Sequence, residues 1–261
     1  MANKREFVDY EIKDRIATVL VDRPPVNALN NQVEEEIGQV FEELALLEEV
    51  GAVIFTGGGE KAFIAGADIQ MLSKKTPQGA YEMSAFTKKI LLKIQTFDRV
   101  VIAAINGLAL GGGCEFAMAC DIRVMDESTI IGLPEVSLGL LPGAGGTQRL
   151  ARLVGVGKAK ELILTGDPID SNEAKSIGLI ERIAPKGKAV SEAMSLAKRI
   201  MQRGPVAVMN AKKAINATIN MTFEEGLKRE TELFSALFET QDVKEGVGAF
   251  LEKRKPNFIG R

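Results

Sequence analysis

Residues 105–121, INGLALGGGCEFAMACD, constrain the fold of this chain more than any other stretch. An apolar, β-branched segment leads into Gly111-Gly112-Gly113, and an apolar segment typical of a helix follows, so we expect a buried strand, a glycine turn and a helix. A bound molecule can lie directly against glycine backbone, in front of the free N–H groups of a helix start. One carboxylate, Glu115, stands in this apolar context, where an unused charge is costly to bury.

The order of the remaining elements predicts an α/β core followed by helices. Strands are expected at residues 6–13, 15–21, 52–56, 99–106, 121–125, 129–132 and 179–183. Helices are expected at residues 31–48, 78–97, 114–119, 145–153, 156–165 and 171–177, and then at 187–202, 205–219, 223–238 and 240–252. Asn30 and either Asp170 or Ser171 are expected as helix N-caps, and residues 61–69 as a loop. We therefore divide the chain into a core, residues 1–185, and a C-terminal helical region, residues 186–261.

Composition excludes several classes of function. The chain has 261 residues, a net charge of −2 and dispersed basic residues, which argues against a nucleic-acid partner. It has no histidine, which removes Ser-His-Asp and Cys-His catalysis and zinc sites that need imidazole. Its two cysteines, Cys114 and Cys120, lie in the apolar stretch and are expected to be buried thiols rather than a disulfide.

The first 15 residues are charged and lack the apolar core of a signal peptide. Residues 100–120 are apolar enough to imitate a membrane span, but their glycines and polar neighbours favour a buried strand–turn–helix. We expect a cytoplasmic protein with no membrane partner.

The glycine loops do not match nucleotide motifs. The segment from Gly111 is not G-x-G-x-x-G, and Gly155-Val-Gly-Lys158 lacks the rest of a Walker loop. What remains is Glu115 and Glu135, each in a weakly charged, glycine-rich neighbourhood. Either one alone can equally be a structural glutamate held by local amides. Together they suggest a carboxylate pair around a water, one giving and one taking a proton. A glycosidase could use such a pair, although a chain with no Trp and two Tyr has few aromatic platforms for sugars.

Three segments give the sequence a family resemblance: AFIAGADI (62–69), AAINGLALGGGCEFAMACDIRV (103–124) and GLPEVSLGLLPGAGGTQRLARLVG (132–155). Weaker matches are RPPVNALN (23–30) and EGVGAFLEKRKPNF (245–258). In this order and spacing they resemble the crotonase (enoyl-CoA hydratase/isomerase) superfamily, and within it most closely the enoyl-CoA hydratases. The resemblance implies a spiral of ββα units whose C-terminal helices build trimers, commonly paired into hexamers.

The resemblance also implies an acyl-CoA thioester substrate, with no metal and no further cofactor. Backbone N–H groups of Ala67 and Gly112 would hold the thioester oxygen as an oxyanion hole, and Glu115 and Glu135 would be the catalytic pair. The substrate-binding loop would comprise Ala65, Gly66, Ala67, Asp68 and Ile69, while residues 71–90 and 223–238 would border the acyl pocket. Gln70 and Pro25-Val26 stand where relatives often have basic residues that contact CoA. Arg23 and Lys253 are possible substitutes, although a solvated surface charge is the more ordinary role for both.

The function expected from this resemblance is hydration of the 2,3 double bond of trans-2-enoyl-CoA thioesters to 3-hydroxyacyl-CoA, in fatty-acid degradation or a related pathway. Two alternatives stay open. One is another crotonase-type reaction on acyl-CoA, such as double-bond isomerisation or a pathway-specific hydration. The other is a non-catalytic or RNA-binding protein on the same fold. Keeping both glutamates favours hydration, but the sequence leaves open which of them is the acid.

Overall fold

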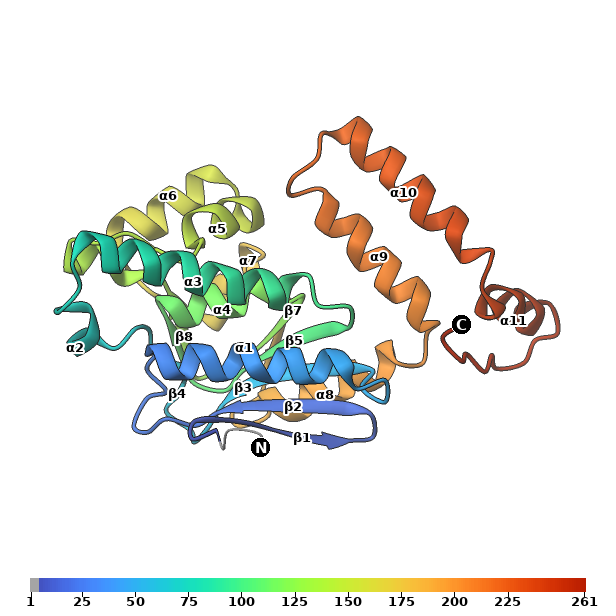
Figure 1. The fold of residues 1–261 in the computed structure, drawn as a ribbon, viewed down its shortest axis with the longest axis horizontal. Helices are drawn as coiled ribbons and strands as arrows, with labels where there is room; N and C mark the ends of the chain where they lie inside the picture. Colours follow the sequence, from blue (N-terminus) through green and yellow to red (C-terminus); the bar gives the residue numbers. More distant parts are fainter. Residues whose placement is uncertain (1–4) are drawn as a thin grey trace.

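The computed structural model describes residues 5–261, which form two β-sheets with helices packed around them (Figure 1). The larger sheet has the spatial order β1 (Val8–Lys13), β2 (Ile16–Val21), β3 (Ala52–Gly57), β5 (Val100–Ile105), β7 (Ile122–Asp126) and β10 (Arg182–Ala184). The smaller sheet has the order β4 (Ala62–Ile64), β6 (Leu108–Leu110), β8 (Ile130–Gly132) and β9 (Ile169–Asp170). All neighbouring pairs are parallel except β1–β2 and β8–β9.

The helices of the core are α1 (Asn31–Leu46), α2 (Ile69–Leu72), α3 (Pro77–Gln95), α4 (Gly112–Ala119), α5 (Gly146–Val154), α6 (Val156–Thr165) and α7 (Ser171–Ser176). They are followed by α8 (Ala189–Ile200), α9 (Pro205–Ala217), α10 (Phe223–Leu237) and α11 (Gln241–Leu251). The predicted N-caps are confirmed, because the side chains of Asn30 and Asp170 each accept a backbone hydrogen bond at 2.9 Å.

From β3 to β8, consecutive strands alternate between the two sheets, so the chain forms the spiral of ββα units that the resemblance implies. The pairs β3–β4, β5–β6 and β7–β8 each give one strand to each sheet before a helical segment returns the chain. As a result, the turns β5–β6–α4 and β3–β4–α2 end beside one another. This places the segments around Gly66 and Gly112, far apart in sequence, beyond the carboxyl ends of the neighbouring parallel strands β4 and β6.

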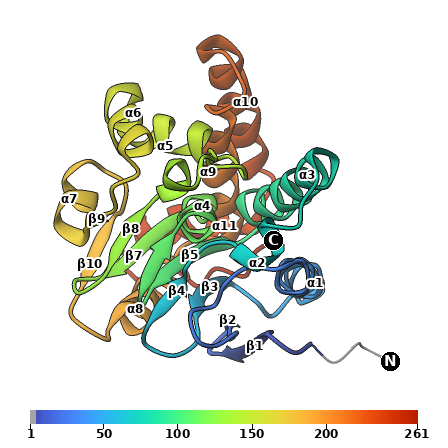
Figure 2. The same cartoon turned by 90° about the vertical axis from the view of Figure 1, so that its left-hand side faces the viewer.

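The core lies on both faces of the large sheet, as expected for parallel strands covered on two sides. In β5, Val101, Ala103 and Ile105 join the cluster under α1, α3 and α4, while Val100, Ile102 and Ala104 join the cluster under α8. Figure 2 shows α3 and α4 above the strands and α8 below them. Cys114 and Cys120 are buried free thiols within the first cluster, as predicted.

Several short elements differ from the sequence prediction. Residues 62–64, expected in a loop, form β4, and the strand β6 was not expected at all. Pro134–Leu138 form a 3₁₀ helix, and the strand expected at residues 179–183 lies at β10. A strand of three residues has too little sequence for a periodic pattern, and pairing with distant strands stabilises it instead.

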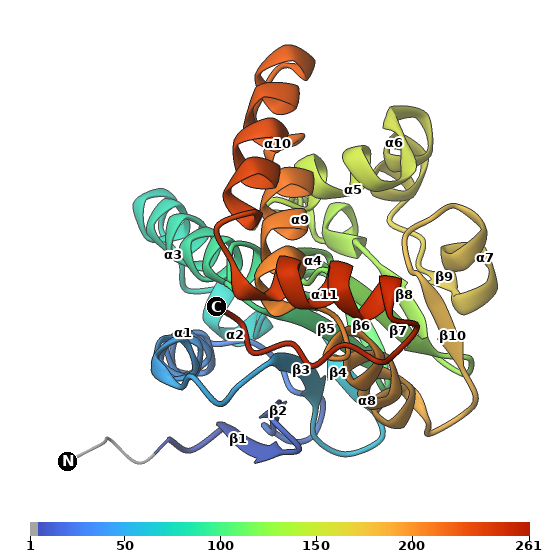
Figure 3. The same cartoon turned by 90° about the vertical axis from the view of Figure 1, so that its right-hand side faces the viewer.

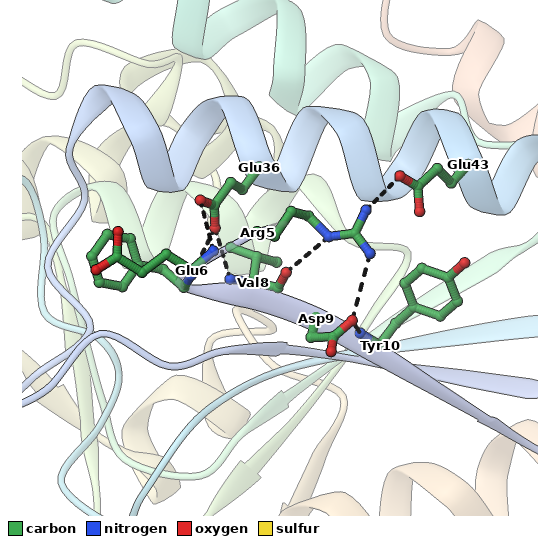
Figure 4. A network of polar contacts seen from close by, with 8 residues as sticks. Arg5, Glu6, Val8, Asp9, Tyr10, Glu36 and Glu43 are labelled. Carbon is green, nitrogen blue, oxygen red and sulfur yellow. Dashed lines mark hydrogen bonds and ion pairs between the residues drawn. The ribbon is translucent and has the colours of Figure 1, made fainter. Parts of the chain in front are cut away.

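The N-terminal strand is attached to α1 by a buried carboxylate (Figure 4). Glu36 accepts hydrogen bonds from the backbone N–H groups of Glu6, Phe7 and Val8 at 2.8–3.0 Å. Burial alone would raise its pKa, but these three donors, together with the side chain of Gln32, hold the pKa of Glu36 below its ordinary value. Arg5 adds an ion pair to Glu43 on the same helix. The first four residues of the charged N-terminal segment lie outside the described residues.

The last helices project from the core (Figure 3). There α9 and α10 lie side by side, and α11 follows them. Lys212 on α9 forms a largely buried ion pair with Asp121 at 2.7 Å, which ties the base of the projection to β5 and β7. Across residues 5–261, no helix combines the length and the apolar character that crossing a bilayer requires.

Candidate active site

The loop after β4 presents one backbone N–H group outward. Leu29 and Ala67 form an isolated parallel bridge, in which Leu29 N donates to Gly66 O and Asp68 N donates to Leu29 O, both at 2.8 Å. Because the peptide bond is trans, a Gly66 carbonyl that faces Leu29 turns the Ala67 N–H the opposite way. Within residues 5–261 this N–H has no hydrogen-bond acceptor.

A second outward N–H group lies at the start of α4. The Gly111 carbonyl accepts the first helical bond from Glu115 N at 3.1 Å, so the trans peptide directs the Gly112 N–H out of the helix end. Among the described residues this N–H also lacks an acceptor. Gly111 has a φ of 54°, and a Cβ built there would lie 3.7 Å from Gly66 Cα. The two glycine loops therefore meet, and their free N–H groups belong to one site.

Glu115 lies on the first turn of α4 and is 2% exposed. Its Oε1 accepts hydrogen bonds from Ala144 N at 2.8 Å and Gly146 N at 2.7 Å. Burial raises the pKa of Glu115, and these two donors and the nearby Arg149 partly offset that rise. The loop that holds Glu115 is itself held, since Arg149 donates to Ala144 O at 3.0 Å. One carboxylate oxygen is thus anchored, which leaves the other to contact a ligand.

Glu135 lies in the 3₁₀ helix, against Gly111. Its Oε1 would be 3.2 Å from a Cβ on Gly111, and its Oε2 is buried with no hydrogen-bond partner among the described residues. Burial, together with the charge of Glu115, raises the pKa of Glu135 to about 7. A buried, unpaired carboxyl oxygen is uncommon in proteins, and it indicates a group that can bind a ligand or give up a proton.

The structure therefore brings Ala67, Gly112, Glu115 and Glu135 together from three segments of the chain: the loop after β4, the start of α4 and the 3₁₀ helix. The other residues of the predicted substrate loop have more local contacts. Ala65 N donates to Val26 O at 3.1 Å, Asp68 caps α2, and Ile69 is 56% exposed. Arg23, a possible CoA contact, donates to Asp68 at 2.8 Å, and its contact with CoA stays a prediction.

Sequence reasoning missed one buried carboxyl group near this site, that of Glu34 on α1, which is 5% exposed. Thr87 Oγ1 lies 2.8 Å from Glu34 Oε2 and 3.0 Å from Met83 O. A hydroxyl has one proton to donate, so both contacts are hydrogen bonds only if Glu34 is protonated and donates to Thr87. Burial raises the pKa of Glu34 to about 7, and the charge of Glu115 adds to the rise. The signal available in sequence was a glutamate within the apolar stripe of a helix.

Replacing Glu34 with glutamine should weaken the pH dependence of stability. Because the folded pKa of Glu34, about 7, exceeds its ordinary 4.5, its contribution to stability is present below pH 4.5 and lost as the pH rises to 7. At 1.36 kcal/mol per pKa unit this loss is about 3 kcal/mol. Urea unfolding between pH 4.5 and 8 should show Glu34→Gln gaining stability relative to the parent protein. The exposed neighbour variant Glu35→Gln serves as control, and a Glu34→Gln protein less stable than it at pH 8 would contradict the assignment.

Two other features bear on the kind of site. Across residues 5–261, no three His, Cys, Asp or Glu side chains are grouped so that they could hold a metal ion.

A cavity of about 940 Å³ lies between α9 and the core, lined by Met118, Ala144, Arg149 and Lys212 among others. Its lining includes neither glutamate of the pair and neither of the two outward N–H groups, but it does include Ala144, whose N–H donates to Glu115. The cavity therefore borders the loop that holds Glu115.

The chemistry of the site is that of an acid–base pair beside two amide donors. A carbonyl oxygen that accepts from Ala67 and Gly112 would be stabilised as it gains negative charge. Two carboxyl groups of raised pKa stand beside it, one anchored and one unpaired. This combination suits proton transfer at carbons adjacent to an activated carbonyl.

The ββα spiral with projecting C-terminal helices is the crotonase fold. The family model described as enoyl-CoA hydratase/isomerase matches residues 11–261, and the chain belongs to this family. The crystal structure of an enoyl-CoA hydratase from Bacillus anthracis superposes with a TM-score of 0.94 at 37% identity, covering 98% of this chain and 100% of that one.

Curated relatives are similar in sequence to this chain over nearly its whole length. The chain is 42% identical to the short-chain-enoyl-CoA hydratase of Clostridium acetobutylicum, over 95% of each chain. It is 41% identical to the crotonyl-CoA hydratase of Syntrophomonas wolfei, over 98% of this chain and 99% of that relative.

Proposed function

We propose that the protein is an enoyl-CoA hydratase that adds water across the 2,3 double bond of short trans-2-enoyl-CoA thioesters. The observation that carries the proposal is the placement of two glutamates of different environment, the buried Glu115 and the half-buried Glu135, beside two unpaired amide donors. The names of the relatives, short-chain-enoyl-CoA and crotonyl-CoA hydratases, support the substrate class.

The thioester oxygen accepts hydrogen bonds from Ala67 N and Gly112 N. As water adds to C3, electrons move onto this oxygen and the thioester becomes enolate-like. Donors that already point at this position meet the charge without reorganising, and one such donor is typically worth about 3 kcal/mol of barrier. The N-terminal end of α4 adds a favourable dipole.

The different surroundings of the glutamates support different roles for them in this proposal. Glu115 accepts two amide donors, which favour its ionised form, so it acts as the base that takes a proton from water. Glu135 has no donor on Oε2 and a pKa of about 7, so it holds a proton to deliver to C2. The water oxygen bonds to C3, its proton goes to Glu115, and the proton of Glu135 goes to C2. Transfer of a proton from Glu115 to Glu135 restores the starting state.

The assembly that we propose is a trimer, alone or paired into a hexamer, built by residues 186–261. Its support is the apolar surface that the projecting helices expose: Phe223, Leu227, Phe234, Phe238, Phe250 and Leu251. Monomeric proteins rarely expose this many large apolar side chains on neighbouring helices. The division of the chain at residue 185, the cytoplasmic location and a role in fatty-acid degradation stay predictions.

Purified protein should hydrate crotonyl-CoA, measured as loss of the ultraviolet absorbance of the conjugated enoyl thioester. Longer 2-enoyl-CoA esters and 3-enoyl-CoA esters, assayed under the same conditions, separate hydration from double-bond isomerisation. We expect crotonyl-CoA to be consumed with formation of 3-hydroxybutyryl-CoA. Conversion of 3-enoyl esters to 2-enoyl esters, with no hydrated product, would overturn the proposal.

A further inference from the structure

Arg23 is fixed by contacts that leave it little freedom. Its Nη1 donates to Ala28 O and its Nη2 donates to Asp68 Oδ2, both at 2.8 Å. Its backbone N–H donates to Asn27 Oδ1 at 2.9 Å, and its guanidinium lies 5.8 Å from the centre of the Phe7 ring. Side chains held at this many points lose the mobility that makes most surface ion pairs weak.

Asp68, which accepts the hydrogen bond from Arg23, is also fixed by several contacts. Its Oδ2 accepts from Arg23, while its Oδ1 accepts from Gln70 N at 3.0 Å and from Met71 N at 3.4 Å at the start of α2. Its backbone N–H donates to Leu29 O. The hydrogen bond from Arg23 is the main cause that lowers the pKa of Asp68. About a quarter of each side chain, 24% for Arg23 and 23% for Asp68, is exposed.

These contacts connect directly to the peptide that carries the Ala67 N–H. Asp68 follows Ala67 in the chain, and the Gly66 carbonyl on its other side accepts from Leu29 N. Arg23 also holds Ala28, the residue before Leu29. The guanidinium therefore bridges both strands of the short bridge that sets the direction of the Ala67 N–H. Gly66 has a φ of 98°, so this loop depends on its neighbours to keep its conformation.

We propose that Arg23 and Asp68 are positioning residues that aim the Ala67 N–H at the thioester oxygen, without contacting the substrate. The inference rests on the proposed hydratase function. It differs from a role of Arg23 in binding CoA phosphates, because here the guanidinium acts through its bonds to Ala28 and Asp68 within the protein. Loss of the pair changes the barrier for addition of water more than it changes substrate binding.

Arg23→Met tests this, because methionine keeps part of the aliphatic stem and removes both donors. We expect kcat with crotonyl-CoA to fall roughly 10- to 100-fold, less than the loss of a whole oxyanion donor, while KM changes less than about threefold. Arg23→Lys has a single ammonium group that cannot bridge both partners, so its kcat should lie between that of the parent protein and that of Arg23→Met. Asp68→Asn, which retains a cap for α2 but not the charge, should resemble Arg23→Met.

A spectroscopic readout distinguishes positioning from a merely structural role. The carbonyl stretch of a bound dienoyl-CoA, followed by Raman difference spectroscopy, reports polarisation of the thioester by the two N–H groups. We expect Arg23→Met to reduce the shift of this stretch. Lys198→Met, which removes an exposed 2.8 Å ion pair with Asp14, should leave the stretch and kcat unchanged.

Three results would overturn the inference: an unchanged kcat, a rise in KM alone, or a loss of activity that follows the loss of folded protein with an unaltered carbonyl stretch. The parent protein separates this inference from the proposed function. If the parent does not hydrate any enoyl-CoA, the proposed function is wrong. If the parent is active and Arg23→Met is equally active, only the positioning role is wrong.

Discussion

Glu135→Gln is expected to lower kcat for hydration of crotonyl-CoA at least about 10³-fold, within the range that a positioned general acid contributes. Glutamine has nearly the same shape, but its amide cannot deliver a proton to C2. The carboxyl group that it replaces has a buried, unpaired Oε2 and a pKa of about 7, so folding should not suffer. Steady-state kinetics and urea unfolding of the same preparation measure both quantities.

The exposed variant Glu35→Gln is the matched control and should retain full activity. Glu115→Gln should be impaired to a similar degree, because its carboxylate takes the proton from water. The double variant should lose little more than either single one, since the two carboxyl groups act in one reaction. Full activity of Glu135→Gln would show that its carboxyl group takes no part, and the two-glutamate mechanism would then fail.

Gly113→Ala is expected to destabilise the fold by about 3 kcal/mol, the upper end for overpacking a buried position. A Cβ at Gly113 would lie 1.9 Å from the backbone oxygen of Ile64, so α4 and β4 would have to separate. Because Gly112 precedes this residue and β4 leads to Ala67, the same separation should spread the two amide donors. We expect a lower midpoint of urea unfolding and a reduced kcat.

The control is Gly157→Ala, in α6. A Cβ there meets nothing within 4 Å, and alanine is the better helix former by about 0.5–1 kcal/mol, so this variant should be unchanged or slightly more stable. If Gly113→Ala were as stable as Gly157→Ala, α4 and β4 could separate without a loss in the free energy of unfolding, and the prediction would be wrong.

Long elements of this fold were predictable because their patterns are local. The helix α1 begins where Asn30 caps it and carries a stripe of apolar residues, and α8 to α11 lie close to the predicted ranges. The short strands β4, β6 and β9 were not predictable, because two or three residues form a strand only when partners from distant turns of the spiral meet them. The 3₁₀ helix that carries Glu135 is equally short.

The same distinction between local patterns and distant partners applies to the residues of the candidate site. Three glycines before Glu115 indicated a close approach of backbone and ligand, and the weakly charged surroundings of Glu115 and Glu135 suggested a carboxylate pair. The family resemblance supplied Ala67 and Gly112 as the amide donors. Nothing local showed that Arg23 pairs with Asp68, since the two lie 45 residues apart. The environment of Glu34 was likewise invisible, because Thr87 approaches it from another helix.

By itself, the sequence determined the order of the long elements, the acidic residues available in a chain without histidine, and the glycines on which close contacts depend. Only the tertiary structure decided which amides stay unpaired and which carboxyl groups have a raised pKa. The physical reason is that a hydrogen bond or a pKa depends on neighbours within a few ångströms. In this spiral, those neighbours come from distant turns of the chain.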